Sequence, residues 1–377
     1  MASCKAETIP GLPSVSNTQV QVDSSGLPLG FPQSVNSKLA WTGADFTNPE
    51  EYILHLSPQD IEEVEAALEF FKGLEKDGDE ISKENFPLAT LGPRLDQMRH
   101  EIHNGKGFGL IRGLDAEHYN VEDRTMIYLG IQSYIANQTG RQDGKGNMIV
   151  HIIADNSSRM AQQHHRHSTS SITFHNEEAG DVVSWLTKST AASGGRCILA
   201  SAYTVYNILA THRPELVRAL AGGDWPFALP KFHCRPILFC HKGRIIMNFG
   251  RTPLLGSAAH PRPSHLPALS PRQLEALNAI ESIAKATQVE IVTKAGDIHF
   301  INNLAVLHRR EGFVNGDDLL QRRHLLRMRL RDEEMGWDIP EQLQSEWYKA
   351  FEDAMADKVW HLQPMPEGYF PLRKMAN

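Results

Sequence analysis

The sequence predicts a mixed α+β protein, mainly β in its core, with helices around a β-sandwich or barrel. Three segments of helical periodicity lie in the N-terminal third, and short β-rich runs with Gly-Asp turns follow from about residue 148. With 377 residues, 41% of them hydrophobic, the chain can bury a sizeable core. We expect residues 41–377 to form a single domain, preceded by an extended N-terminal arm over residues 1–40.

Composition and charge exclude several classes of function. A net charge of −7 argues against sequence-independent binding of nucleic acid, which needs a basic surface. No apolar run reaches the ~20 residues that span a bilayer, and the N-terminus lacks the apolar segment of a secretory signal. The four cysteines are too few and too scattered for a disulfide scaffold. We therefore expect a cytoplasmic protein in a reducing setting, without a nucleic-acid or membrane partner.

Helix signals define the N-terminal third. Ser57 and Pro58 open the first helix as an N-cap and a proline at the first helical position. The second helix is predicted after Pro93 and ends at Asn104, and the third covers about residues 121–138. In each, apolar residues recur at the three-to-four-residue spacing of a helix face. Between the second and third, residues 108–112 are predicted to form a buried strand.

The remaining chain is rich in short strand patterns. The first set of predicted strands covers residues 148–154, 171–175, 182–187 and 196–200. A hairpin of residues 236–241 and 244–249 follows, turning at Lys242-Gly243. One helix capped by Ser270 interrupts the strands, and a C-terminal helix is expected after Pro340. The last set of strands covers residues 289–293, 298–302, 305–308 and 322–330.

One short motif carries metal-ligand chemistry. In an extended strand, His175 and Glu177 point the same way and Asn176 points the other way. Alternation therefore favours Glu177 over Glu178 as the partner of His175. If the segment ending at His308 lies beside them, two histidines and one carboxylate occupy one face of a metal ion, as in non-haem Fe(II) oxygenases. An ordinary surface loop is the alternative for the His-x-Glu motif alone.

A basic strand follows this histidine. With a period of two, Arg323, Leu325, Arg327 and Arg329 share one face. A solvated edge strand is one interpretation of this pattern. The other is that a guanidinium facing the interior binds a carboxylate with two hydrogen bonds.

Other histidines and cysteines give weaker signals. His164, His165 and His167 are more typical of a solvated loop than of a second metal site. His299 is expected to be a strand residue rather than a fourth ligand, and His324 should face away from the two flanking arginines. A further cluster has a spacing that fits no zinc-finger pattern, so we expect its members to be ordinary strand residues: His233, Cys234, Cys240 and His241.

Several motifs in a fixed order resemble one known family. The segment Phe174-His-Asn-Glu-Glu-Ala-Gly-Asp-Val-Val183 resembles the metal-binding strand of the taurine dioxygenase (TauD/TfdA) family. The resemblance covers roughly residues 108–337. The chain looks like a fungal-type member of the family, and such members often modify small metabolites. The supporting motifs, in order, are Gly194–Ser201, Val205–Leu209, Arg213–Leu216, Gly296–Asn303, Val306–His308 and Arg322–Arg327.

The resemblance implies a fold, a metal and a co-substrate. The implied fold is a double-stranded β-helix (jelly-roll, cupin-like) core over about residues 108–337, with surrounding helices. The implied metal is Fe(II), bound by His175, Glu177 and His308, and the implied co-substrate is 2-oxoglutarate. No catalytic residue beyond the metal ligands is implied, because hydrogen abstraction from carbon requires no protein general base.

Three further residues acquire roles from the resemblance. Arg323 matches the arginine that holds the distal carboxylate of 2-oxoglutarate. Cys197 stands where the family usually has Thr or Ser hydrogen-bonded to the same co-substrate; a thiol is a weak donor, so Arg323 should carry more of the binding. Arg327 matches an arginine that meets the anionic group of the substrate, with an ion pair to a protein carboxylate as the alternative.

The sequence therefore predicts an Fe(II)/2-oxoglutarate-dependent dioxygenase of secondary metabolism. Its partners would be 2-oxoglutarate, O2 and a small-molecule substrate, and a homo-oligomer is possible. Glu177 stands where many members have Asp, and relatives with His-x-Glu include clavaminate-synthase-like enzymes that oxidise amino acids. Together with Arg327, this resemblance favours an amino or carboxylic acid as the substrate to be hydroxylated, desaturated or cyclised. A catalytically inactive jelly-roll metal or metabolite binder is the alternative that Cys197 favours. A metal-dependent hydrolase lacks a motif for its general acid or base.

Overall fold

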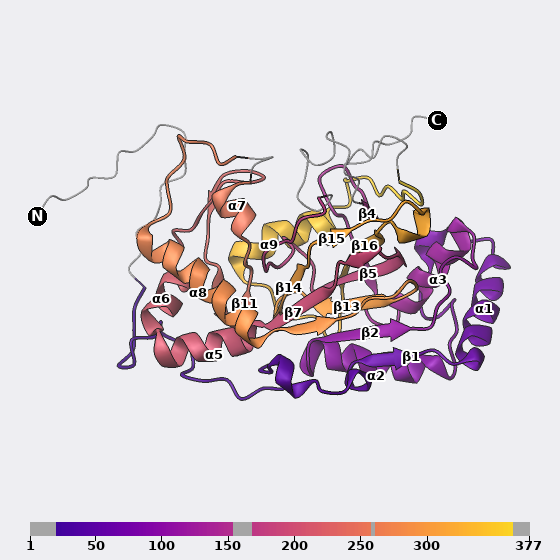
Figure 1. Cartoon of the computed structure of the whole chain (residues 1–377), viewed down its shortest axis with the longest axis horizontal. Coiled ribbons are helices and arrows are strands. Elements are labelled where there is room, and N and C mark those ends of the chain that lie inside the picture. Colours follow the sequence, from indigo (N-terminus) through magenta and orange to yellow (C-terminus); the bar gives the residue numbers. More distant parts are fainter. Residues whose placement is uncertain (1–19, 154–167, 258–260, 365–377) are drawn as a thin grey trace, which may run out of the picture.

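The computed structural model describes residues 20–153, 168–257 and 261–364, and a seven-stranded sheet forms its centre (Figure 1). This major sheet has the strand order β1-β2-β13-β5-β16-β3, and β4 pairs with the other end of β16. All its pairings are antiparallel except β1 with β2. Its strands are β1 (Ile53–His55), β2 (Phe108–Arg112), β3 (Gln138–Gly140), β4 (Val150–Ile153), β5 (Val182–Ser189), β13 (Ile298–Asn302) and β16 (His324–Arg331).

A smaller antiparallel sheet packs against the inner face of the major sheet. It has the order β12-β7-β14, with β12 at Val289–Ile291, β7 at Cys197–Ser201 and β14 at Val306–Arg310. Residues of both sheets, among them Trp185 and Leu199, belong to one buried hydrophobic cluster. Two largely antiparallel sheets that enclose one core form the jelly roll that the family resemblance implies.

Three helices cover the outer face of the major sheet (Figure 1). They are α1 (Pro58–Lys72), α2 (Leu91–Asn104) and α3 (Val121–Gln132). Their apolar faces and the outward residues Leu326 and Met328 of β16 form a second buried cluster. Leu325, which directly precedes Leu326 and points to the other face of the strand, belongs to the inner core instead.

A second group of helices packs beside the smaller sheet of β12, β7 and β14, at the opposite end of the molecule from α1 and α3 (Figure 1). It consists of α5 (Ala202–His212), α6 (Pro214–Ala221) and α8 (Pro271–Thr287), and α8 contacts β7. Short helices α7 (Arg251–Leu255) and α9 (Glu341–Trp347) complete the set. In the described ranges, every helix is too short or too polar to cross a membrane.

Short elements connect these layers. The two-stranded pairs are β6 (Ser193–Gly194) with β15 (Phe313–Val314), β8 (Pro226–Phe227) with β9 (His233–Cys234), and β10 (Leu238–His241) with β11 (Arg244–Met247). Single helical turns lie at Gly43–Asp45, Pro49–Glu51, Gly78–Glu80, Leu319–Gln321 and Tyr348–Glu352.

Many predicted elements are confirmed, some to the residue. The side chain of Ser57 caps α1, which begins at Pro58, and β2 covers the predicted residues 108–112. The β10–β11 hairpin turns at Lys242 and Gly243, which have φ angles of 48° and 75°. Two positive φ values in succession are the requirement of a type I′ turn.

Other predictions were wrong. Residues 171–175 form no strand, and only His175 makes isolated bridges, to Gly250 and His308. Helix α3 ends at Gln132, six residues before the predicted end, because the chain turns there and enters β3 at Gln138. Helices α5 and α6 were not predicted; Val, Thr and Tyr in α5 weaken its helical signal, and packing on α8 stabilises it.

Candidate metal centre

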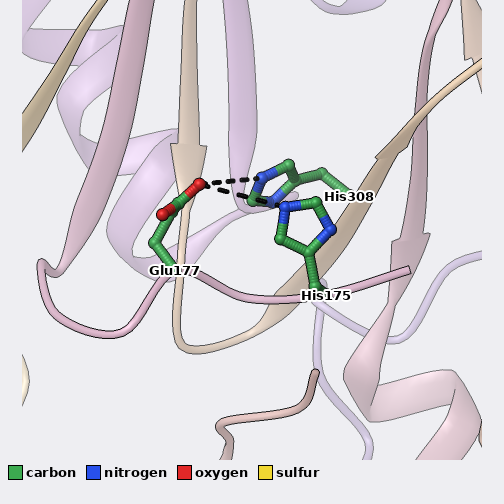
Figure 2. Close-up of side chains that lie close together, drawn as sticks. All are labelled: His175, Glu177 and His308. Atoms are coloured by element: carbon green, nitrogen blue, oxygen red, sulfur yellow. Dashed lines mark ion pairs between the residues drawn. The ribbon is translucent and has the colours of Figure 1, made fainter. Parts of the chain in front are cut away.

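Three side chains from two distant segments converge beside the inner face of the major sheet (Figure 2). The Nε2 atoms of His175 and His308 each lie 3.9 Å from Oε1 of Glu177. The three candidate ligand atoms all lie within 4.8 Å of one another. The sequence prediction that these residues lie together therefore agrees with the geometry.

Backbone pairing brings the two histidines together. The backbone amides of His175 and His308 donate to each other's carbonyl oxygens at 3.0 Å. Pairing with β7 places His308 opposite Leu199 and fixes β14. Two isolated bridges at His175 thus replace the predicted strand, and Glu177 still lies on the side of His175 while Glu178 is exposed.

The donor set fits a divalent iron ion. Nδ1 of His175 lies 3.0 Å from the carbonyl oxygen of Thr173; a carbonyl only accepts, so Nδ1 carries the proton and Nε2 is the unprotonated nitrogen. Nδ1 of His308 is buried without a hydrogen-bond partner in the described part of the chain. Two imidazoles and one carboxylate on one side, with further positions for other ligands, are the donors typical of non-haem Fe(II) oxygenases.

Two arginines hold the Glu177 carboxylate, which is only 3% exposed. Nη1 of Arg327 forms an ion pair with Oε1, and its Nη2 donates to Oε1 of Gln142 at 2.9 Å. Nη2 of Arg329 lies 3.8 Å from Oε2 of Glu177. The ion pair with a protein carboxylate, the alternative role of Arg327, is thus formed in this structure.

Arg323 differs from these arginines because no carboxylate pairs with its guanidinium among the described residues. The guanidinium lies over the ring of Phe313, 5.5 Å from the centroid, and burial lowers its pKa to about 10. It lines one cavity together with the three candidate ligands, Arg327 and Cys197. Burial raises the pKa of the Cys197 thiol to about 12, so this neutral thiol does not balance the charge.

Apart from Arg309 and Arg310, the rest of the cavity lining is apolar. Its lining includes the side chains of Ile152, Ile172, Trp185 and Leu325. The ring of Trp185 lies 6.1 Å from that of His308, so an aromatic wall stands beside the candidate ligands. Such a wall limits the access of water and strengthens electrostatic interactions within the cavity.

Several other candidates lie apart from this cavity. His299 stacks on Trp185 at 4.9 Å and belongs to no group of possible ligands in the described residues. His324 faces the outer side, where its Nε2 lies 2.8 Å from Nδ1 of His151. The predicted loop histidines His164, His165 and His167 lie outside the described residues. His233, Cys234, Cys240 and His241 lie on β9 and β10, which belong to two separate sheets.

The amide side chains around Glu177 form a set of contacts that was not predicted from the sequence. Asn303 and Asn248 hydrogen-bond its backbone, and Gln142 binds Arg327. The only signal in the sequence is the pair Asn302-Asn303 after an apolar strand, where buried amides must find partners. The sequence does not say which backbone groups those partners are.

Comparison with known proteins places this geometry among dioxygenases. The model of the family described as "Taurine catabolism dioxygenase TauD, TfdA family" matches residues 71–329. The taurine hydroxylase-like protein SAT17 of Stachybotrys chartarum is 34% identical over 345 residues, which cover 88% of this chain and 89% of that protein. The FR-33289 synthase of Streptomyces rubellomurinus is 24% identical over 263 residues, covering 66% of this chain and 76% of its own.

Solved structures share the fold. An asparagine oxygenase in complex with Fe(II), 2S,3S-3-hydroxyasparagine and succinate superposes with a TM-score of 0.59 at 17% identity, covering 76% of this chain and 98% of its own. The non-heme iron oxygenase OrfP in complex with Fe and alpha-ketoglutaric acid gives a TM-score of 0.52 at 14% identity. The match covers 74% of this chain and 94% of that protein. At these identities the likeness establishes the jelly-roll fold.

Proposed function

The chain belongs to the TauD/TfdA family of dioxygenases, and on that premise we propose that it oxidises a small amino or carboxylic acid in secondary metabolism. As a member of this family it is an Fe(II)/2-oxoglutarate-dependent dioxygenase. We further propose which residues bind the iron, which class of substrate is oxidised, and that the reaction is a hydroxylation, a desaturation or an oxidative cyclisation.

We assign Fe(II) to His175, Glu177 and His308. Their convergence beside Arg323, which has no carboxylate partner among the described residues, is the observation that carries the proposal. The hydrogen bond from Nδ1 of His175 to Thr173 orients that ring and leaves Nε2 as the donor. The buried Glu177 supplies the negative charge that a divalent cation requires.

Arg323 is proposed to bind the distal carboxylate of 2-oxoglutarate. A buried guanidinium without a carboxylate partner is costly, and a bound carboxylate would remove that cost. Cys197 lines the same cavity as a neutral thiol and contributes at most a weak hydrogen bond.

The bound iron, 2-oxoglutarate and O2 together supply the oxidising power, and 2-oxoglutarate leaves as succinate and CO2. The chain's own residues bind the reactants, orient them and keep water away. Trp185 and Leu325 form the dry wall beside the ligands, and Arg323 sets the direction of the co-substrate. No protein group needs to accept a proton from the carbon that is attacked.

The substrate class rests on charge and on the ligand motif. Arg327 lines the cavity, and an anionic substrate would share it with Glu177 once the metal binds that carboxylate. Solved relatives described as an asparagine oxygenase and an oxygenase bound to L-homoarginine support an amino acid as the substrate.

The cytoplasmic location and a homo-oligomer remain part of the proposal, to be tested by cell fractionation and size-exclusion chromatography.

The test is a substrate screen scored by succinate. We expect purified protein with Fe(II), 2-oxoglutarate and O2 to form succinate, fastest with an amino or carboxylic acid present. His308→Ala should bind no iron after anaerobic loading and form no succinate. Wild-type activity in His308→Ala would refute the ligand assignment, and a folded, iron-loaded wild type without turnover on any substrate would support the inactive binder instead.

A further inference from the structure

The backbone of Glu177 lies outside every strand, although its side chain belongs to the candidate metal centre. In the described residues, the segment 168–181 has only isolated bridges at His175. The backbone amide and carbonyl of Glu177 therefore lack the hydrogen bonds that a neighbouring strand would provide in a β-sheet. Buried backbone groups without such partners need others, because an unsatisfied group is costly.

Side-chain amides take the place of the missing ladder. The backbone amide of Glu177 donates to Oδ1 of Asn303 at 2.7 Å. Nδ2 of Asn303 donates to the carbonyl oxygens of Glu177 at 3.1 Å and Gly180 at 3.0 Å. Nδ2 of Asn248 donates to the same Glu177 carbonyl at 3.2 Å. One fully buried side chain thus holds both backbone groups of a candidate ligand.

The same network joins the two segments that carry the ligands. Nδ2 of Asn176 donates to the carbonyl oxygens of Asn303 at 2.7 Å and Val306 at 3.1 Å. Its Oδ1 accepts from the amide of Phe249 at 3.0 Å. Asn303 and Val306 lie five and two residues before His308, so the position of Glu177 is fixed relative to the second histidine.

From this geometry we infer that Asn303, supported by Asn176 and Asn248, is a positioning residue for the metal ligand Glu177. It acts through the backbone of Glu177 and touches neither metal nor substrate. The inference rests on the proposed function, because it assumes that Glu177 binds the metal. Residues that orient metal ligands typically change metal affinity by about 10–100-fold when they are removed.

Asn302 offers a matched control. It is as buried as its neighbour, and its side chain makes two hydrogen bonds, from the amide of Leu304 at 3.0 Å and to the carbonyl of Ile102 at 3.1 Å. Neither bond reaches Glu177. Asn302→Ala should therefore lose stability as Asn303→Ala does, but keep its metal affinity.

The experiment measures Co(II) affinity by the change in visible absorption, and thermal stability, for wild type, Asn303→Ala, Asn302→Ala and Asn248→Ala. We expect Asn303→Ala to weaken Co(II) binding at least about tenfold and Asn248→Ala by less, with Asn302→Ala within about twofold of wild type. Asn303→Asp keeps the acceptor for the Glu177 amide but puts an oxygen against two carbonyls, so it should recover only part of the affinity.

The outcomes separate this inference from the proposed function. If Co(II) binds wild type and His308→Ala equally, the metal site itself is wrong. If His308→Ala abolishes binding while Asn303→Ala and Asn302→Ala bind Co(II) alike, the metal site stands and the positioning role is refuted. Should Asn303→Ala fail to fold, Asn248→Ala decides: unchanged affinity in that folded variant overturns the inference.

Discussion

At the scale of single residues, charge decides how the cavity works. Glu177 pairs with Arg327 and lies near Arg329, so its negative charge is more than matched before any metal binds. Arg323 adds a further buried positive charge without a carboxylate partner among the described residues. A dianionic co-substrate and an anionic substrate would both lower the electrostatic cost of this arrangement.

Arg323→Ala should weaken 2-oxoglutarate binding at least about tenfold, because a charge-assisted hydrogen bond contributes roughly 1.5–3 kcal/mol. Cys197→Ala should be nearly neutral, since its thiol is a weak donor. Anaerobic calorimetry with metal-loaded protein measures both affinities. The melting temperature of Arg323→Ala should stay level or rise, since a desolvated cation is removed. Equal losses of affinity in the two variants would contradict the assignment.

Arg327→Leu should destabilise the metal-free protein by about 3 kcal/mol, because it leaves the buried Glu177 carboxylate without its closest partner. Metal binding would compensate that carboxylate, so the stability gained on adding metal should exceed the gain in wild type. Denaturation with and without Co(II) measures the difference. The substrate KM should rise strongly while 2-oxoglutarate affinity changes little.

Arg327→Lys is the control that retains a positive charge at this position. It should keep most of the stability of the metal-free protein but lose the two-pronged contact to Glu177 and Gln142. If wild-type enzyme oxidises a substrate acid and its carboxamide equally well, Arg327 binds no substrate anion and serves Glu177 alone.

At the scale of elements, β16 links two different environments. Its inner face carries Leu325, Arg327 and Arg329 toward the cavity and the inner core. Its outer face carries Leu326 and Met328 into the core under α1, α2 and α3. Alternate residues of one strand should therefore have separable effects on binding and on stability.

Leu326→Ala tests this separation. The side chain is fully buried in the outer core, so its truncation should cost about 2–5 kcal/mol of stability. The affinity of the folded variant for 2-oxoglutarate should match that of wild type. Urea denaturation and calorimetry below the melting temperature provide the two numbers, with Leu326→Met as a volume-conserving control. A loss of affinity as large as that of Arg323→Ala would show that the strand does not insulate its two faces.

Local signals in the sequence predicted the elements that depend on local physics. The Ser57 cap, the Lys242-Gly243 turn and the alternation along β16 follow from backbone and side-chain rules, and all three are present. The same alternation placed His175 and Glu177 on one side, although no strand forms there. The bonds of Asn303 that hold Glu177 join residues 126 positions apart, and no local pattern encodes such a contact.

At the scale of the whole molecule, buried polar contacts tie the N-terminal helices to the C-terminal segment. Arg99 of α2 binds the buried Asp332 that follows β16, and Nε1 of Trp337 donates to the carbonyl oxygen of His103 at 3.1 Å. Nε1 of Trp347 in α9 donates to Oδ1 of Asp181 at 2.7 Å. Because both cores share the major sheet and these contacts link α2 and α9 to segments next to its strands, we propose that residues 41–377 unfold in one cooperative transition.

Buried titratable groups make the free energy of unfolding depend on pH. Burial lowers the pKa of His103 to about 4 and that of His151 to about 4, so both are neutral in the folded state near pH 7. In the unfolded chain their pKa is about 6.5. The unfolded state therefore binds more protons between about pH 4 and 6.5, and stability falls as pH falls through that window.

Asp181 opposes this dependence. Burial raises the pKa of its carboxyl to about 7, so the folded state holds the extra proton between about pH 4 and 7. Burial lowers the pKa of His299 and His324 as well, so acidification favours folding through Asp181 and disfavours it through four buried histidines, which should prevail because they are more numerous.

We expect wild-type stability to fall from pH 6.5 to pH 4.5, each histidine contributing on the order of 1 kcal/mol per pH unit. Asp181→Asn removes the opposing proton and should make the fall steeper, while His103→Leu should make it shallower. Urea denaturation of all three proteins at half-unit pH intervals gives the slopes. Parallel slopes for wild type and Asp181→Asn would mean that Asp181 is ionised in the folded protein throughout this range, and that α9 is held by a carboxylate rather than by a neutral carboxyl group.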